Sequence, residues 1–375
     1  MYDIVVLSTV HHYQDARIFY KEIPSIKKVC NNLCFMVPVN KEKEFIENGV
    51  NIIPLRNPST KFERIKLQIT AWKKIKAIKP KIVHFHDPEL IVLGYFLKKV
   101  LKIKVVFDIH ENVSESFKDN LWIPSYLKPI IPKVYSKIEN ILIKDFDAVI
   151  IAEKSYRETY GERPIELLNY PISEGRDFKK KNFNEKLKMV YIGGIWERRG
   201  IFQMLRLFNK LEKEGFDLSL SLVGPFVPKE LKQSVENFVS ENKLKDKVVI
   251  YGRKTLTEVY DILEDCHLGL SLMKNIKNYN KSLSTKIFDY MLSSIPYVVS
   301  NFKIYSDYTI NSETGIAVDY NDEEDMYLKV KALLNDKSKL SLMSNNGFCL
   351  VKEKWNWETQ EKKLFALYKK LLDQE

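Results

Sequence analysis

The hydrophobic positions along the chain follow two alternating patterns. Continuous apolar runs, typical of buried strands, occur at residues 3–10, 33–39, 51–55, 81–85, 104–109 and 148–152. Between these runs, apolar residues recur every three or four positions and predict amphipathic helices at 62–78, 89–101 and 133–144. In the first helix the repeating positions include Ile65, Ile69 and Ile75. Apolar strands alternating with helices predict a parallel sheet that is covered on both faces.

The same alternation starts again after a polar, charged stretch at residues 171–187. Strands are predicted at 188–192, 218–223, 248–251, 268–272, 297–299 and 315–318, with helices between them and a last helix from Trp357 to Leu372. We therefore predict an α/β fold with two doubly wound, Rossmann-like domains facing a cleft. The first domain takes residues 1–170, the linker 171–187 and the second domain 188–355. In such folds ligands bind beyond the carboxyl ends of the strands.

Residues 282–300 read SLSTKIFDYMLSSIPYVVS and predict a loop, a helix and a buried strand. Lys286 lies in the first helical turn, and Asp289 lies on the same face one turn later. Free N–H groups at the helix start favour an anion, and Ser284 or Thr285 can cap the helix. This pattern predicts a diphosphate on Lys286 and ribose hydroxyls on Asp289, with a donor-binding loop that comprises Ser282, Leu283, Ser284 and Thr285. The alternative is an ordinary surface helix with a Lys286–Asp289 ion pair.

Glycine and arginine residues follow the predicted strands of the second domain. The first strand runs into GGIWERRG, in which Gly193 and Gly194 allow a close backbone approach. Arg199, with Arg198 beside it, is placed to clamp a diphosphate; the alternative is a solvent-exposed arginine. Two further strand ends carry Gly224 and Arg253 at the same expected edge.

Histidines mark the strand ends of the first domain. Five of the six histidines lie in the segments HH at 11–12, HFHD at 84–87 and DIHE at 108–111. Their side chains suit hydrogen bonding to sugar or phosphate, or acid–base chemistry. Alternatively they are packed or capping histidines, or His-x-His binds a metal; no further ligand set supports a metal, and we expect none. Asp145 and Asp147 form an Asp-x-Asp pair, but at the end of the sheet opposite to ligands, so we expect a structural role.

The charge of the chain is concentrated in one region. The formal net charge is +11, and residues 61–144 hold 17 Lys or Arg against 8 Asp or Glu. This predicts an acidic partner such as an anionic membrane surface, or else simply solvated helix faces. Nucleic acid is not expected, because no basic-aromatic motif is present. No apolar run approaches the ~20 residues of a membrane span, and the N-terminus reads as a strand rather than a signal peptide. We expect a cytoplasmic protein, with a peripheral position at the inner face of the membrane suggested by the charge.

Four segments together resemble the retaining, metal-independent glycosyltransferases of the GT-B fold, in particular glycosyltransferase family 4. They are VHHYQDARIFYKE near the start, VVFDIHE, YIGGIWERRG and STKIFDYMLSSIPYVVS. The resemblance covers nearly the whole chain. In the family's Gly-Arg…Lys-Gly element, Gly194 takes the Arg position and Arg199 the Lys position. In its Glu-x7-Glu pair, the second Glu corresponds to Asp289 and the first falls on Lys281.

The resemblance also implies roles for the first domain. His110 would reach the donor sugar near the reacting carbon, and the acceptor side would be lined by His11, His12, Asp15 and Arg17. We count His86, at the same edge, with the acceptor-binding residues. The final helix, residues 356–375, would cross back onto the first domain.

These observations predict a glycosyltransferase that moves a sugar from a nucleotide-diphosphate donor, UDP or GDP foremost, to a glycan or lipid-linked glycan, with retention and without metal. Bacterial cell-surface polysaccharide synthesis is the expected pathway. The alternatives are a nucleotide-sugar epimerase of the same fold, for which no proton-abstracting set is visible, and an inactive scaffold, which the loss of the first Glu at Lys281 leaves open.

Overall fold

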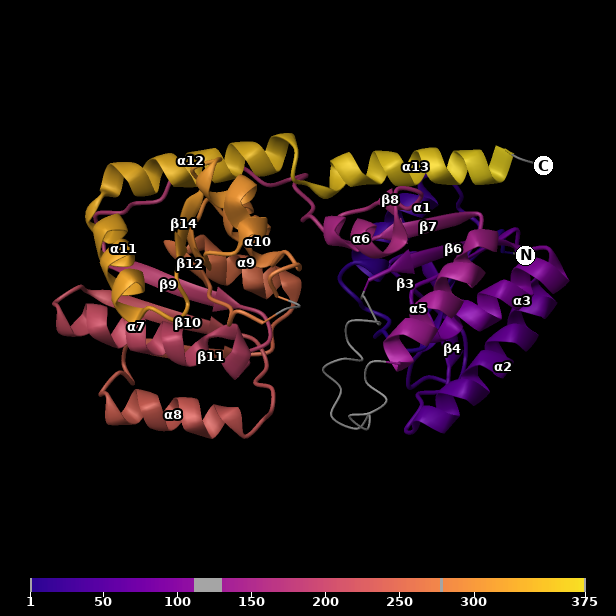
Figure 1. Cartoon of the computed structure of the whole chain (residues 1–375), viewed down its shortest axis with the longest axis horizontal. Helices are drawn as coiled ribbons and strands as arrows, with labels where there is room; N and C mark the ends of the chain where they lie inside the picture. Colours follow the sequence, from indigo (N-terminus) through magenta and orange to yellow (C-terminus); the bar gives the residue numbers. More distant parts are fainter. Residues whose placement is uncertain (1, 111–129, 277–278, 374–375) are drawn as a thin grey trace. The chain divides into compact units, whose positions relative to one another are not determined.

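The computed structural model describes residues 2–110, 130–276 and 279–373, and Glu111 of the VVFDIHE segment lies outside them. The chain divides into two compact units, Met1–Asn169 with Trp357–Glu375, and Tyr170–Asn356 (Figure 1). The stretch predicted as a linker, residues 171–187, is thus part of the second unit. Phe183 packs into the core of that unit, and the Lys181 ammonium donates to the Leu263 carbonyl over 3.1 Å. Burial of both side chains fixes this polar segment to the unit.

The first unit contains an eight-stranded sheet in the order β3-β4-β2-β1-β5-β6-β7-β8. All neighbours are parallel except β3 and β4, which are antiparallel. The strands are β1 (Ile4–Leu7), β2 (Leu33–Pro38), β3 (Phe45–Glu47), β4 (Val50–Leu55), β5 (Ile82–Phe85), β6 (Lys104–Ile109), β7 (Ala148–Ile151) and β8 (Ile165–Glu166). In register, Val6 of β1 lies between Phe35 of β2 and His84 of β5.

Helices cover both faces of this sheet because each strand sends alternate side chains to opposite sides. One core contains Val5, Leu7, Val83 and Phe85 with apolar residues of α2 (Lys61–Ile78) and α3 (Ile91–Leu101). The other contains Ile4, Val6 and Ile82 with residues of the remaining helices on that side, which are η1 (Ile18–Glu22), α1 (Ile23–Lys27) and α13 (Trp357–Asp373). The helix α5 (Ile131–Leu142) packs against α3, and α6 (Arg157–Tyr160) is a single turn between β7 and β8. The final helix therefore packs on the first unit, as the family resemblance implied.

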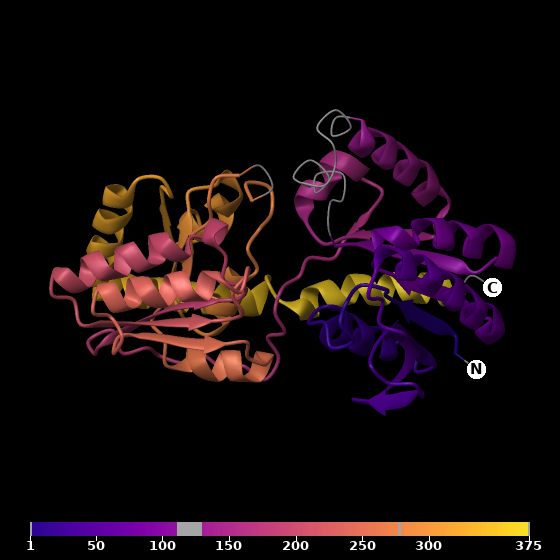
Figure 2. The ribbon, with the colours of Figure 1, turned by 90° about the horizontal axis from the view of Figure 1, so that it is seen from below.

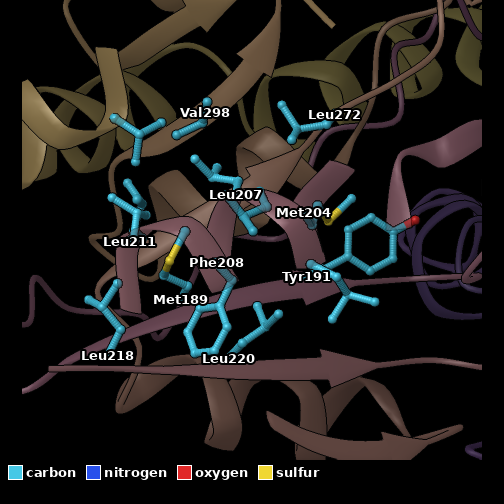
Figure 3. Packing of buried hydrophobic residues seen from close by; sticks show 14 of the residues in the cluster. Met189, Tyr191, Met204, Leu207, Phe208, Leu211, Leu218, Leu220, Leu272 and Val298 are labelled. Atoms are coloured by element: carbon cyan, nitrogen blue, oxygen red, sulfur yellow. The ribbon is translucent and has the colours of Figure 1, made fainter. Parts of the chain in front are cut away.

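The second unit has a six-stranded parallel sheet in the order β11-β10-β9-β12-β13-β14. Its strands are β9 (Leu187–Ile192), β10 (Leu218–Val223), β11 (Val248–Gly252), β12 (Leu268–Ser271), β13 (Tyr297–Ser300) and β14 (Gly315–Val318). The helices are α7 (Ile201–Lys213), α8 (Leu231–Glu241), α9 (Leu256–Glu264), α10 (Lys286–Leu292), α11 (Glu323–Asn335) and α12 (Lys337–Glu353). Figure 3 shows part of its core, where Met204, Leu207 and Phe208 of α7 pack against Met189 and Leu220 of the sheet.

Both sheets have the strand order of a Rossmann fold. Counted along the parallel strands from β1 and from β9, each order runs third, second, first, fourth, fifth, sixth, and in the first unit β8 follows as a seventh parallel strand. The order reverses direction between β1 and β5 in the first unit and between β9 and β12 in the second. Ligands bind beyond the carboxyl ends of strands at such switch points. These two strand ends are therefore where we look for function.

The short elements of the first unit did not appear in the sequence prediction. The turns of η1 and α1 span Ile18–Lys27, and β3 is an antiparallel edge strand of three residues, Phe45–Glu47. Elements this short contain too few positions for a period of 3.6 or 2 to be recognised. The expectation of a wholly parallel first sheet was wrong at this one edge.

Candidate active site

Two glycine loops meet at the switch point of the second unit. Gly193 follows β9 with φ of +102°, and Gly224 follows β10 with φ of +146°. A Cβ atom on Gly224 would lie only 2.0 Å from the Gly193 carbonyl oxygen, so no side chain fits there. Gly193 N–H donates to the Val223 carbonyl over 2.8 Å and holds the two loops together. The glycines thus bring two strand ends into contact, as their positions predicted.

Lys286 and Arg199 lie against the first of these loops. A Cβ on Gly193 would be 3.0 Å from Lys286 Cε, and one on Gly194 would be 3.4 Å from Arg199 Nη1. Arg199 Nη1 donates to the Gly194 carbonyl over 3.3 Å, while its Nε is buried and has no hydrogen-bond partner. The structure therefore gathers four predicted residues, Gly193, Gly194, Arg199 and Lys286, at one strand end.

The electrostatics of this pair favour an anionic ligand. Burial, and next the charge of Arg199, lower the pKa of Lys286 from 10.5 to about 7, although Asp289 opposes the shift. Within the described residues neither Lys286 nor Arg199 forms an ion pair with a carboxylate. Two neighbouring cations in a partly dehydrated site repel each other. An anion bound between them would remove that repulsion and restore the charge of the lysine.

The hydrogen bonds around α10 differ from the predicted ones. Thr285 is the N-cap residue, but its side chain accepts no capping hydrogen bond. Ser284 does not cap either, because its Oγ accepts from Ser271 Oγ over 3.0 Å and its N–H donates to Tyr305 Oη over 3.2 Å. The loop is thus tied to β12 and to η6 (Lys303–Tyr305) rather than to the helix.

Asp289 is oriented from another helix. Its Oδ1 accepts a hydrogen bond of 2.7 Å from the Tyr260 hydroxyl of α9, and no Lys286–Asp289 ion pair is among the contacts of the described chain. The simpler alternative of a surface ion pair is therefore wrong. The bond to Tyr260 fixes the carboxylate of Asp289 while leaving the side chain half-buried at the loop.

The surroundings of the other predicted donor-binding residues differ from those of Lys286. Arg198 stacks on the Trp196 ring, 4.2 Å from its centre, and lines a pocket of about 650 Å³ whose walls include neither Arg199 nor Lys286. Arg253 is exposed after the edge strand β11, and Ser282 and Leu283 are half-buried. Strand β10 lies between β11 and β9, so Arg253 does not follow a neighbour of the strand that leads into the Gly193–Gly194 loop. The predicted donor-binding residues therefore extend along more of the sheet edge than Lys286 and Arg199 occupy.

Histidines gather at the switch point of the first unit. His86 follows β5 and His110 follows β6, and His86 Nδ1 lies 3.3 Å from His110 Nε2. The His11 ring, after β1, is 5.4 Å from the His110 ring. His11 also faces two carboxylates, with Nδ1 at 3.4 Å from Asp15 and Nε2 at 3.5 Å from Asp87. The convergence predicted from three strand ends is therefore present.

Exposure separates the surface of this cluster from its base. The side chains of His11 and Asp15 are each 28% exposed and that of His110 is 12% exposed, whereas that of His86 is fully buried. The prediction that His86 contacts an acceptor is wrong, because the other histidines cover it. His12 is exposed, and its ring lies 4.8 Å from that of Tyr13.

Arg17 also lies in the buried part of the cluster and does not face an acceptor. It is 4% exposed, its Nη2 lies 2.8 Å from Asp108 Oδ2, and its Nε lies 2.6 Å from Glu22 Oε1. Its Nη1 donates to the Leu167 carbonyl over 2.7 Å. The expectation from the resemblance is corrected: the guanidinium contacts two buried carboxyl groups beneath the histidines and is the counterion of Asp108.

Burial and the charge of Arg17 set the protonation of the buried side chains beneath His11 and His110. Although burial favours the neutral acid, Arg17 and then His110 hold the pKa of Asp108 well below its usual value. Burial, reinforced by the charge of Asp108, raises the pKa of Glu22 well above 4.5. Burial lowers the pKa of His84 to about 4 and that of His86 well below 6.5, so both rings are neutral near pH 7.

One group of side chains at this base has the composition of a metal site. The ligand atoms of Glu22, His84, His86 and Asp108 all lie within 4.8 Å of one another. However, the guanidinium of Arg17 already contacts both carboxylates of the group. A divalent cation would have to share them with a fixed positive charge, so these residues fit an arginine better than a metal.

Several members of this network, Asp108, Asp87 and Tyr368 among them, were not predicted as site residues. Asp108 holds His110, with Oδ2 at 3.2 Å from its Nε2, and Asp87 accepts from the Ser8 hydroxyl over 2.9 Å. Both stand beside strand-end histidines in the sequence, and that position was the available signal. Tyr368 of α13 lies 2.8 Å from His84 Nδ1, and nothing in the local sequence could have indicated this long-range pair.

Comparisons with known proteins agree with this geometry. The family described as Glycosyl transferases group 1 matches residues 173–348, and Glycosyltransferase Family 4 matches residues 33–166. Each match lies within one of the two Rossmann-like units. The chain is a glycosyltransferase of the GT-B type.

This glycosyltransferase is similar to curated and solved relatives over most of its length. It is 20% identical over 357 residues to the capsular polysaccharide biosynthesis glycosyltransferase CapM of Staphylococcus aureus, covering 88% of this chain and 87% of CapM. Anabaena HepE in complex with UDP and glucose superposes with a TM-score of 0.74 at 10% identity, over 98% of this chain and 99% of HepE. WaaG, a glycosyltransferase involved in lipopolysaccharide biosynthesis, gives a TM-score of 0.70 at 11% identity, over 97% and 99% of the chains.

Across the described part of this glycosyltransferase, no helix combines the length and the apolar composition needed to cross a membrane.

Proposed function

We propose that this glycosyltransferase uses a nucleotide-diphosphate sugar and that Lys286 and Arg199 bind the diphosphate. The observation that carries the proposal is the pair of neighbouring cations, one of them with a pKa lowered to about 7, beside the Gly193–Gly194 loop. Solved relatives of the same fold contain UDP or UDP-glucose. Uridine is accordingly the first base to test, and guanosine the second.

The proposed chemistry needs no metal. When the bond between the sugar and the diphosphate breaks, negative charge develops on the leaving phosphate, and fixed cations stabilise that charge. Arg199 supplies a planar guanidinium and Lys286 a point charge that becomes protonated as the anion arrives. In the proposal Asp289, held by Tyr260 over 2.7 Å, receives the ribose hydroxyls.

The stereochemical outcome and the role of His110 follow from the family resemblance. We propose transfer with retention, in which the acceptor attacks on the face that the leaving group occupies, and His110 orients the donor sugar. The network beneath His110 supports this role, because Asp108 Oδ2 lies 3.2 Å from its Nε2 and the His86 ring lies against it. On the acceptor side, His11 and Asp15 remain exposed enough to contact a sugar.

The proposed acceptor is a glycan or lipid-linked glycan of cell-surface polysaccharide synthesis. CapM, the similar curated enzyme, is described as a capsular polysaccharide glycosyltransferase. An acceptor on a membrane lipid would place the enzyme in the cytoplasm at the inner membrane face. The excess of basic residues between 61 and 144 is consistent with that position.

A donor screen tests the proposal directly. Binding and hydrolysis of UDP-, GDP-, ADP- and CMP-sugars are measured with EDTA present, for the wild type, for Lys286→Ala and for Lys245→Ala. Lys245 is an exposed lysine of the same unit and serves as the matched control. We expect one nucleotide class to bind wild type and control alike, and Lys286→Ala to lose that binding.

Two results would contradict parts of the proposal. Unchanged nucleotide affinity in Lys286→Ala would reject the diphosphate site, and activity that disappears with EDTA would reject metal independence. With an acceptor in hand, proton NMR of the anomeric signal decides between retention and inversion. Formation of an epimerised nucleotide sugar would instead support the epimerase alternative, and nucleotide binding without turnover of any acceptor would support the scaffold.

A further inference from the structure

A pocket of the second unit lies beside the candidate active site but is not part of it. Its volume of about 650 Å³ falls in the range of roughly 300 to 1,000 Å³ that is typical of small-molecule pockets. It is lined by side chains of η5 (Glu197–Arg199), of α7 and of the loops after β10, β12 and β14, Arg198, Lys274 and Tyr320 among them, and we call it the η5 pocket. Its place beyond the carboxyl ends of parallel strands is where α/β folds bind ligands.

Basic side chains dominate the charge of the η5 pocket. Three of them line it, namely Arg198, Arg206 and Lys274, whereas Glu197 is the carboxylate among the described lining residues. Arg206 is neutralised, because its Nε lies 2.6 Å from Glu323 Oε1. The exposed side chains of Arg198 and Lys274 form neither an ion pair nor a hydrogen bond within the part of the chain that the structure describes. Two cations are therefore left for an anion that enters the pocket.

These two cations come from adjacent backbone segments. The Lys274 N–H donates to the Arg198 carbonyl over 3.0 Å, which ties the loop after β12 to η5. The Arg198 guanidinium lies on the Trp196 ring, with its central carbon 4.2 Å from the ring centre, so its plane is fixed while its N–H groups stay unbonded. A planar guanidinium can donate to two phosphate oxygens at once, and a lysine adds a point charge. The pair therefore fits a phosphate group.

The remaining walls of the pocket fit a sugar ring. Trp196, Phe202 and Tyr320 supply aromatic surface, against which the apolar C–H face of a sugar can pack. Gln203 and Asn321 supply amide groups that are not hydrogen-bonded to any other described residue. An amide both donates and accepts, as a sugar hydroxyl does. A phosphate ion alone would leave the aromatic and amide walls without a partner.

Consecutive residues of η5 serve the pocket and the cation pair. Arg199 donates to the Gly194 carbonyl over 3.3 Å beside Lys286, whereas Arg198 lines the pocket. Lys286 belongs to α10, which contacts α12, but the pocket is bounded by α7, which contacts α11. The helices α7 and α11 lie side by side in Figure 1 and in the turned view of Figure 2. A ligand in the η5 pocket therefore leaves the proposed diphosphate site open.

We propose that the η5 pocket is a second ligand site, which binds a phosphorylated sugar. Arg198 and Lys274 hold the phosphate, the sugar ring packs against the aromatic wall that includes Trp196, and Asn321 contacts its hydroxyls. The site stands on the residues of the pocket itself. Only the statement that a nucleotide occupies Lys286 at the same time rests on the proposed function.

Isothermal titration calorimetry tests the proposal on the full chain. The probes are the monophosphates of glucose, mannose and N-acetylglucosamine, compared with glucose, glucuronate and inorganic phosphate. The variants Lys274→Gln and Arg198→Gln each remove one of the two cations. The matched control Lys245→Gln removes an exposed lysine of the same unit that does not line the pocket. Because the side chains of Arg198 and Lys274 hydrogen-bond no described residue, both variants should fold, and thermal unfolding checks this.

We expect at least one sugar phosphate to bind the wild type and the control alike. Each pocket variant should bind it at least about tenfold more weakly, because a charged hydrogen bond to the phosphate is lost. Glucose, glucuronate and inorganic phosphate should also bind the wild type at least about tenfold more weakly, since each lacks either the phosphate or the ring. Lys274→Gln should keep the affinity for UDP, whereas Lys286→Ala should lose UDP and keep the sugar phosphate.

Four results would overturn the proposal. They are a wild type that binds none of the sugar phosphates, a Lys274→Gln variant that binds them as tightly as the wild type, inorganic phosphate that binds as tightly as the sugar phosphates, and a Lys286→Ala variant that loses them. The last result would place the sugar phosphate in the diphosphate site. A wild type that binds a sugar phosphate but no nucleotide would instead contradict the proposed function and support the second site.

Discussion

The protonation of Lys286 makes nucleotide binding depend on pH. In the free protein the pKa of Lys286 is lowered to about 7, first by burial and next by the charge of Arg199. A bound diphosphate favours the charged lysine and therefore raises this pKa. Binding is then coupled to uptake of a proton when the pH lies above the pKa of the free protein. Affinity is near its maximum at about pH 6 and falls as the pH rises through about 7.

The size of the effect follows from the pKa. At a pKa of about 7, Lys286 is about nine-tenths protonated at about pH 6 and about one-tenth protonated at about pH 8. If only the charged lysine binds the diphosphate, the apparent affinity falls about tenfold over this range, or about 1.4 kcal/mol.

Isothermal titration calorimetry can measure both affinity and proton uptake. The nucleotide sugar that binds best is titrated at both pH values in buffers with different ionisation enthalpies, because its diphosphate does not itself titrate in this range. The Lys286→Arg variant is the control, since a guanidinium stays charged throughout. Its affinity should not depend on pH. Equal wild-type affinity at both pH values, without proton uptake, would refute the assigned role of burial and of Arg199.

Three further predictions concern the scaffold. Gly224→Ala should abolish nucleotide binding because its Cβ would lie 2.0 Å from the Gly193 carbonyl, whereas Gly215→Ala, with nothing within 4 Å, should retain it despite about 1 kcal/mol of backbone strain; equal binding by both would contradict the close approach. Burial raises the pKa of Glu139 from 4.5 to about 7, so the native state binds more protons than the unfolded state and loses stability as the pH rises through this range. Relative to the wild type, Glu139→Gln should therefore gain up to about 3 kcal/mol of unfolding free energy between about pH 5 and about pH 8. Parallel pH profiles of the two proteins in urea unfolding would count against this prediction. Tyr368→Phe removes the 2.8 Å contact to His84 and should cost about 1–3 kcal/mol, with an unchanged unfolding midpoint as the contrary result.

The regular part of the fold could be predicted because it is local. The longer strands of the two sheets are mostly apolar and most of the longer helices have a period near 3.6, and both signals can be read without information from distant residues. The cation pair was predictable for a related reason. Parallel strands bring their carboxyl ends to one edge, and Gly193, Arg199 and Lys286 all follow such ends or open the next helix.

The same periodicity also misled where a helix carries two apolar stripes. In the helix at 62–78 the sequence pattern included Ile65 and Ile69 in the buried face, yet both are more than half exposed. The core contains Leu67 and Ala71, which lie between the residues of that pattern, together with Ile75, which belongs to it. A period specifies that a face is apolar, but not whether a sheet or a membrane covers it.

The histidine cluster shows a further limit. The sequence placed His11, His86 and His110 at neighbouring strand ends, but it did not indicate how deeply each side chain is buried. Depth depends on what packs above and below, and here Arg17 comes from η1, far from β5 and β6 in the chain. From the family resemblance Arg17 was expected to bind the acceptor, whereas its burial makes it a counterion of buried carboxyl groups.

The sequence by itself determined two Rossmann-like units, their strand ends, and a set of lysine, glycine and arginine residues at one strand end of the second unit. These follow from hydrophobic period and strand direction, which are properties of neighbouring residues. Only the tertiary structure decided which polar residues are dehydrated and which apolar residues are left in water. It lowered the pKa of Lys286, buried Arg17 beneath the histidines and left Ile65 and Ile69 exposed. Exposure is set by contacts between segments that are distant in sequence, and a linear pattern does not contain them.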